Sequence, residues 1–131
     1  MDTLTKEQIL KQDDLKREQV DVPEWGGSVW VRTLTGTERD QFEGSVIERR
    51  GKDTAFNYRN LRAKLAVLTI VDEKGTRLFT DDDVAALGLK SSAALDRVFE
   101  IAQRLNGLSR QDVDELAKNS GSVPSEDSTS D

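Results

Sequence analysis

Hydrophobic and polar residues alternate in two stretches near the start of the chain, residues 16–22 and 29–34. A period of two with β-branched and aromatic residues is typical of strands that bury one face. The residues between them, 23–28, include a proline and two glycines, which end a strand and favour a loop longer than two residues. We therefore predict a β-hairpin over residues 15–34, with Trp25 on or near its loop.

Most of the remaining chain has the helical period of three and four residues, and several segments begin with a capping box. These signals predict a short helix after Thr5 and further helices at about residues 37–50, 57–69, 81–87, 92–105 and 109–118. Gly51 is expected to end the first of the longer helices, and Tyr58 is expected on the buried face of the next. Residues 70–79 predict a turn and a short strand.

The predicted elements fit one domain, because 131 residues are too few for two well-formed cores. We predict an N-terminal arm with a short helix over residues 1–14, a single domain over residues 15–118, and a disordered acidic, Ser-rich tail over residues 119–131. The expected fold class is α+β. A small N-terminal β-hairpin or antiparallel sheet packs on a mainly α-helical body of about four to five helices.

Composition and charge exclude several functions. The chain has no histidine and no cysteine, so it lacks thiol nucleophiles, the imidazole base and the usual zinc ligands. Its net charge of −6 disfavours general binding to nucleic acid. Neither a signal peptide nor a run of 18 apolar residues is present, which favours a cytosolic protein.

Two groups of carboxylates are candidates for chemistry. The triplet at residues 81–83 lacks the alternating oxygen ligands, glycine and glutamate of a calcium loop, so helix capping is favoured over a metal site. Asp13 and Asp14 are adjacent and polar, and a solvated surface is favoured over paired acid–base catalysis. We expect no catalytic residue, no cofactor and no metal. A carboxylate-dependent hydrolase that uses these groups is the enzymatic alternative.

Five apolar side chains are candidates for partner binding. A tryptophan such as Trp25 or Trp30 either closes a core or anchors an interface, with the core favoured. The last predicted helix has an apolar stripe, which docks on its own domain or on a partner, with the former favoured. Its apolar residues are Leu108, Val113 and Leu116.

Residues 22–27 (VPEWGG) and 29–43 (VWVRTLTGTERDQFE) resemble the tail assembly chaperones of long-tailed, siphovirus-type bacteriophages. The resemblance continues more loosely through residues 65–68, 78–80 and 105–109. It covers most of the chain from about Leu15 onward.

This resemblance implies a small α+β protein without enzymatic activity that acts in the host cytoplasm. Such a chaperone binds the tape-measure protein and the major tail-tube protein during tail assembly and is absent from the mature virion. The family implies that a longer product can arise by ribosomal frameshifting, and self-association is a further expectation. Partners other than proteins, namely nucleic acid and membrane, are not expected. The alternative is a permanent virion component such as a connector or tail-completion protein.

Overall fold

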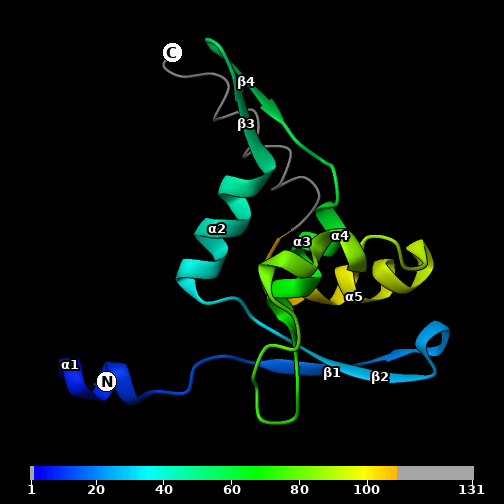
Figure 1. The fold of residues 1–131 in the computed structure, drawn as a ribbon. Coiled ribbons are helices and arrows are strands. Elements are labelled where there is room, and N and C mark those ends of the chain that lie inside the picture. Colours follow the sequence, from blue (N-terminus) through cyan, green and yellow to red (C-terminus); the bar gives the residue numbers. More distant parts are fainter. Residues whose placement is uncertain (1, 109–131) are drawn as a thin grey trace.

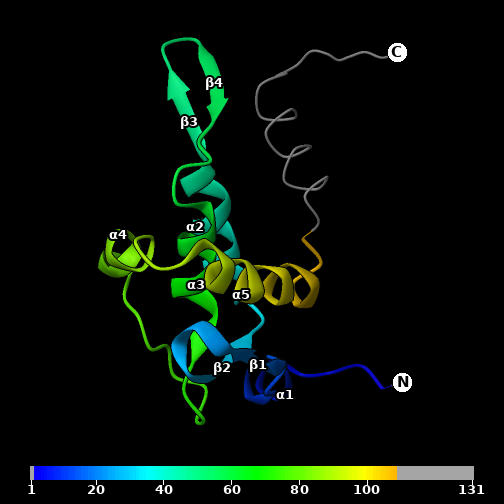
Figure 2. The same cartoon turned by 90° about the vertical axis from the view of Figure 1, so that its right-hand side faces the viewer.

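The computed structural model describes residues 2–108, apart from the side chains of Arg49, Arg50, Thr54 and Phe56. Within this range the chain has an α+β fold, as the sequence predicts. A three-stranded antiparallel sheet lies below a group of helices, and a separate two-stranded hairpin projects from the opposite side (Figures 1 and 2). The helix predicted at 109–118 and the tail 119–131 lie outside the described residues.

The N-terminal hairpin is confirmed. Strands β1 (Arg17–Val22) and β2 (Gly27–Arg32) pair antiparallel, and β5 (Ile70–Val71) adds to β2, giving the order β1-β2-β5. The register sets Val20 opposite Val29. Because side chains alternate between faces, the valines of both strands lie on the face that the helices cover.

The connection between β1 and β2 is the 3₁₀ turn η1 (Pro23–Trp25). Proline fits the first position of this turn because its φ angle is already fixed near the helical value. Gly26 follows with φ +75°, and its N–H donates to the Pro23 carbonyl at 3.0 Å. This left-handed residue returns the chain into β2.

Helices α3 (Leu61–Thr69) and α5 (Ser92–Leu105) pack on each other, and α5 crosses β1 and β2 on one face of the sheet (Figure 2). The apolar stripe of α5 has the helical period and is buried along its length. The largest fully buried apolar side chains are Leu65, Ile70, Val22, Val31, Val46, Val67, Val71 and Val98.

The helix expected at 37–50 is shorter than predicted. Helix α2 (Gly36–Val46) ends at Val46, and the chain continues into the hairpin of β3 (Ile47–Arg50) and β4 (Asp53–Phe56). Gly51, at φ +65°, makes the turn of this hairpin rather than a helix end. A glycine with positive φ serves both purposes, so the local signal does not separate them.

The helix expected at 57–69 begins four residues late, at Leu61. The Asn57 side chain accepts a hydrogen bond from the Arg59 N–H at 2.9 Å, and Asn60 has φ +56°. These residues hold a turn that keeps the preceding chain out of the helix. Tyr58 is therefore 55% exposed and not on the buried face.

Capping boxes set the starts of three elements. Thr5 and Gln8 form one at α1 (Lys6–Lys11), and Thr35 and Glu38 form another at α2. The third joins Thr80 to Asp83 across η2 (Asp81–Asp83), which runs directly into α4 (Val84–Leu87). Each box satisfies backbone N–H groups that the first helical turn leaves without partners.

Candidate protein-binding groove

Trp25 lies in the turn of the first hairpin, where η1 contacts α5. The neighbouring Glu24 accepts a hydrogen bond from Arg97 of α5, with 2.9 Å between Oε1 and Nε. That hydrogen bond is the main reason why the pKa of Glu24 lies below its usual range. The ion pair ties the turn to the helix. The indole of Trp25 is half-buried and packs against the edge of the core.

Phe79 and helix α4 lie opposite Trp25. Arg77 donates to the Val67 carbonyl at 3.0 Å and to Asp81 at 2.9 Å, which fixes the chain on both sides of Phe79. The Thr80 N–H donates to Asp83 Oδ2 at 2.8 Å and so sets the start of η2. Phe79 is consequently held half-buried beside the core, below α4.

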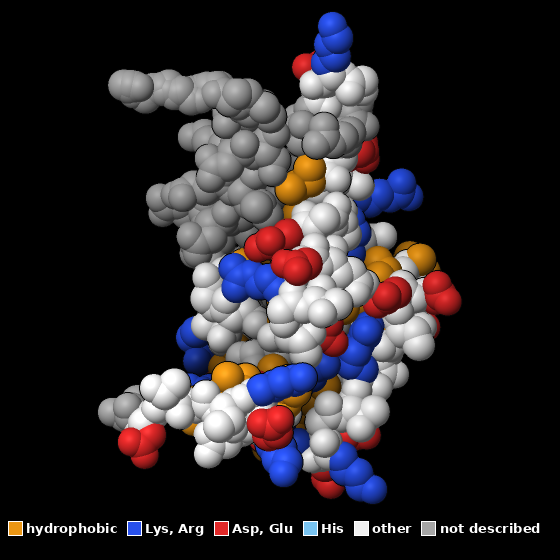
Figure 3. Space-filling view, turned by 90° about the vertical axis from the view of Figure 1, so that its left-hand side faces the viewer, with side chains coloured by type: hydrophobic (Ala, Val, Ile, Leu, Met, Phe, Trp, Pro, Cys, Tyr) orange, Lys and Arg blue, Asp and Glu red, His pale blue; other side chains and the backbone are white. Residues whose placement is uncertain are grey.

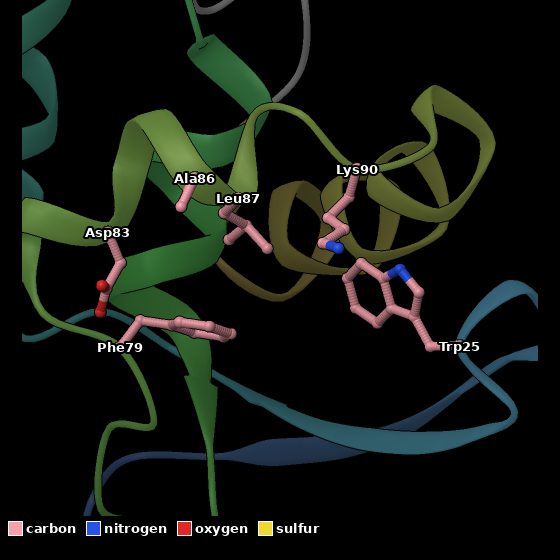
Figure 4. Close-up of a pocket in the computed structure, with 6 residues that line it drawn as sticks. All are labelled: Trp25, Phe79, Asp83, Ala86, Leu87 and Lys90. Atoms are coloured by element: carbon pink, nitrogen blue, oxygen red, sulfur yellow. The ribbon is translucent and has the colours of Figure 1, made fainter.

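An open hollow of about 370 Å³, here called the Trp25 groove, lies between Trp25 on one side and Phe79 on the other, with α4 beside it. Figure 4 shows Trp25 and Phe79 on its two sides, with Leu87 above and between them. Its size is within the range of roughly 300–1,000 Å³ that is common for binding pockets. The groove is lined by Trp25, Phe79, Asp83, Ala86, Leu87 and Lys90.

Two charged side chains border the apolar centre of the Trp25 groove. Asp83 lies on the Phe79 side, and Lys90 extends toward the indole of Trp25 (Figure 4). One carboxylate oxygen of Asp83 is used in the capping box, while the side chain of Lys90 is exposed. The groove thus offers an apolar surface with a negative charge at one side and a positive charge at the other.

Trp30, the second tryptophan, does not line the Trp25 groove. The alternation along β2 places it on the face of the sheet opposite the helices. Arg17 covers its ring, with the guanidinium carbon 4.5 Å from the ring centroid, and also donates to the carbonyl of Glu73. The structure therefore does not bring Trp30 together with Trp25, and Trp30 is partly closed off by Arg17.

The third candidate, Leu108, is a core residue. Gly107 has φ +65°, and the Leu108 N–H donates to the Gln103 carbonyl at 2.8 Å, which is the pattern of a Schellman motif. The Leu108 side chain is only 6% exposed. Val113 and Leu116, the other two candidates from the last predicted helix, lie outside the described residues.

Two carboxylates of the triplet at 81–83, those of Asp81 and Asp83, have structural partners. Asp81 accepts hydrogen bonds from Arg77 and Gln41, which keep its pKa below the usual range. Asp83 completes a capping box, so the capping interpretation is confirmed. Among residues 2–108, no group of three or more acidic side chains is arranged to hold a metal ion.

In the same range, no helix has both the length and the apolar character needed to cross a bilayer.

Sequence reasoning identified Trp25 but not the rest of the groove. Nothing in the sequence marks Phe79, Ala86, Leu87 or Lys90 as part of a binding surface. The walls come from segments more than 50 residues apart in the chain, so only the tertiary fold brings them together.

Two other hollows have a different character. One, of about 540 Å³, is a recess near Asp14, Thr33 and Asn106 that is lined by both polar and leucine side chains. The other, of about 270 Å³, lies between α2 and α3 beside Phe42. Neither contains an exposed aromatic side chain of the kind that anchors protein interfaces. The Trp25 groove is therefore the better candidate for a binding surface.

Together, these features define a small α+β protein whose candidate site is an apolar groove suited to binding another polypeptide. The family model of phage tail assembly chaperones matches residues 5–119, and the chain belongs to this family. The resemblance seen in residues 22–43 is thereby confirmed.

Among solved structures, the chain is similar to the tail assembly chaperone of bacteriophage HK97. The TM-score is 0.53 and the identity 16%, over 76% of this chain and 94% of that chain. At this identity the likeness concerns the fold alone. No curated protein gave a significant match.

Proposed function

We propose that this chain is a non-enzymatic chaperone that binds the tape-measure and major tail-tube proteins in the host cytoplasm while the phage tail is assembled, and that it leaves before the virion is complete. Membership of the tail assembly chaperone family supports a role in tail assembly. The absence of histidine and cysteine from the chain is consistent with a protein that acts through its surface.

The observation that carries the proposal is the Trp25 groove. A half-buried tryptophan and a phenylalanine face an open apolar hollow, and aromatic residues in such pockets are common binding hot spots. Figure 3 shows a face on which basic and acidic side chains are mixed and hydrophobic side chains are visible only in small patches. The groove is thus suited to cover an apolar segment of a client.

The proposal is tested by co-expressing this chain with the tape-measure and tail-tube proteins encoded by the same phage. The readouts are the soluble yield of each client and its co-purification with the chaperone. Ala86→Glu places a larger, charged side chain in the groove, and we expect at least about tenfold weaker binding, because a client that covers the groove would have to bury the added carboxylate.

Ala85→Glu is the matched control. Ala85 is the neighbouring residue of α4, is also exposed, and does not line the groove, so the added charge and the helix are the same. Client binding by this variant should equal that of the wild type. The proposal is wrong if the wild type binds neither client, or if the two variants behave alike. Mass spectrometry of purified virions tests whether the chain leaves before the virion is complete. Stoichiometric amounts of the chain in virions would indicate a structural component instead.

A further inference from the structure

One of the two charged side chains that line the Trp25 groove, Asp83, is already compensated within the chain. Its Oδ2 accepts hydrogen bonds from the Thr80 N–H at 2.8 Å and from the Thr80 hydroxyl at 3.3 Å. These bonds form the capping box at the start of η2 and are part of the fold itself. Asp83 therefore does not need a cation from a binding partner.

Lys90 is the charged side chain of the groove that lacks such compensation. In the part of the chain that the structure describes, its ammonium group has no hydrogen-bonding or ion-pair partner. Figure 4 shows this side chain extended toward the indole of Trp25. By contrast, Lys64, which lines the hollow beside Phe42, donates to the Ser45 carbonyl at 2.9 Å. The charge that the Trp25 groove offers to a partner is thus positive.

The backbone fixes the position from which Lys90 reaches the groove. Its N–H donates to the Leu87 carbonyl at 3.0 Å in the turn that follows α4. The next residue, Ser91, is the N-cap of α5 and accepts from the Ala94 N–H at 3.3 Å. Because the backbone is held on both sides, only the lysine side chain has to become ordered when a partner binds, which keeps the entropic cost of binding low.

The elements around the groove favour a helical partner over an extended one. The lining residues come from η1, η2, α4 and the connections beside them, and none of them belongs to a strand. In the described range the groove therefore has no strand edge to which an extended peptide adds backbone hydrogen bonds, whereas a helix binds through side chains alone. A volume of about 370 Å³ is suited to a few anchoring side chains from one helix face.

We propose that the Trp25 groove binds an amphipathic helix of the client that has an aspartate or glutamate three or four residues from its apolar anchor. The anchor lies between Trp25 and Phe79, and the carboxylate pairs with Lys90. Residues three and four apart are neighbours on a helix surface, so one segment reaches both. The inference rests on the proposed function, because it takes the groove to be the client site. It adds the chemistry that distinguishes a bound client segment from other apolar segments.

The first test changes the charge of Lys90 and measures the Kd for the tape-measure and tail-tube proteins of the same phage by calorimetry. Lys90→Met keeps the length of the side chain but removes its charge, so binding should weaken about threefold to fivefold, as for other partly exposed ion pairs. Lys90→Glu places two like charges opposite each other and should weaken binding at least about tenfold. Lys90→Arg keeps the charge and should bind nearly as the wild type does.

Lys52→Glu is the matched control for Lys90→Glu. Lys52 is exposed at the tip of the projecting hairpin and does not line the groove, so the net charge changes equally while the groove stays the same. This variant should bind client as the wild type does. Added salt should weaken binding by the wild type more than binding by Lys90→Met. The proposal is wrong if Lys90→Glu and Lys52→Glu bind client equally well.

A zero-length crosslinker identifies the group that pairs with Lys90. A carbodiimide joins a lysine amine to a carboxylate in contact with it, and mass spectrometry of the complex then locates the linked residue. We expect an aspartate or glutamate of the client, with an apolar residue three or four positions away. Replacing that acidic residue by lysine should weaken binding to the wild type and restore binding to Lys90→Glu. A link from Lys90 to the C-terminal carboxylate of the client, or to a carboxylate of this chain itself, would overturn the proposal.

The groove variants separate this inference from the proposed function. If Ala86→Glu loses client while Lys90→Glu binds as well as Lys52→Glu, the groove is the client site but its partner needs no carboxylate, and only this inference is refuted. If the wild type binds neither client, the proposed function is refuted as well. Weaker binding by both Ala86→Glu and Lys90→Glu, with Lys52→Glu unchanged, supports both.

Discussion

The ion pair between Arg32 and Glu38 is predicted to be the electrostatic contact on which stability depends most among those described. Two nearly parallel hydrogen bonds join the guanidinium to the carboxylate, at 2.8 and 2.9 Å. The side chains are only 9% and 14% exposed. Glu38 also accepts from the Thr35 N–H at 3.0 Å and so completes the capping box of α2.

The Glu38→Ala substitution removes all of these bonds at once. It leaves the Arg32 guanidinium buried, and within residues 2–108 the partner that remains is the Thr33 carbonyl at 2.9 Å. Breaking a buried ion pair by removing one partner costs roughly 3–5 kcal/mol, out of the 5–15 kcal/mol typical of a domain. For a domain of about 100 residues this corresponds to a fall in Tm of roughly 15–25 °C.

The assay is thermal and urea unfolding followed by circular dichroism, with Glu43→Ala as the matched control. Glu43 is on the same helix and pairs with Arg39 at 3.2 Å, but those side chains are 32% and 39% exposed. An exposed pair of this kind contributes at most about 1 kcal/mol. If Glu38→Ala costs no more than Glu43→Ala, the reasoning from burial is refuted.

Three further outcomes are expected. Burial raises the pKa of Glu38, but hydrogen bonds from Arg32 and Thr35 outweigh it and hold that pKa below its usual range, so the contribution of Glu38 to stability is present at neutral pH and is lost as the pH falls through the lowered pKa. Urea titrations at a series of acidic pH values should therefore show a larger loss of stability in the wild type than in Glu38→Ala, in which Glu24 and Asp81 still titrate. Gly107→Ala should cost about 1 kcal/mol in urea unfolding, because φ is +65° there, whereas Gly27→Ala, at an open position without positive φ, should be close to neutral. In a Trp30→Phe chain, Trp25 is the only indole, and its fluorescence emission should shift to shorter wavelength when client binds; an unchanged spectrum on saturation would contradict client binding at the groove.

Elements with local signals could be predicted from the sequence. The capping boxes at Thr5, Thr35 and Thr80 each depend on residues three apart, and all three are present. The same is true of the first hairpin, whose strands are adjacent in sequence and have a clear period of two. Local backbone geometry and side-chain chemistry decide these features together.

The second hairpin and the groove could not be predicted in the same way. Gly51 is compatible with a helix end and with a hairpin turn, and the choice depends on the pairing of residues 47–50 with 53–56. The groove depends on Trp25, Phe79 and α4 meeting in space, which leaves no periodic pattern in any one segment. Leu108 likewise belongs to the buried core, a tertiary contact that its local sequence does not reveal.

The junction between α3 and β5 determines where foreign sequence can be introduced. The last residue of the helix, Thr69, is fully buried, donates its hydroxyl to the Leu65 carbonyl at 2.8 Å and is followed directly by Ile70 of the strand. With no connecting loop, one inserted amino acid there would send every later side chain of the strand to the wrong face. An epitope tag is better accommodated after Gly51, at the exposed tip of the projecting hairpin, where it would leave both the core and the groove intact.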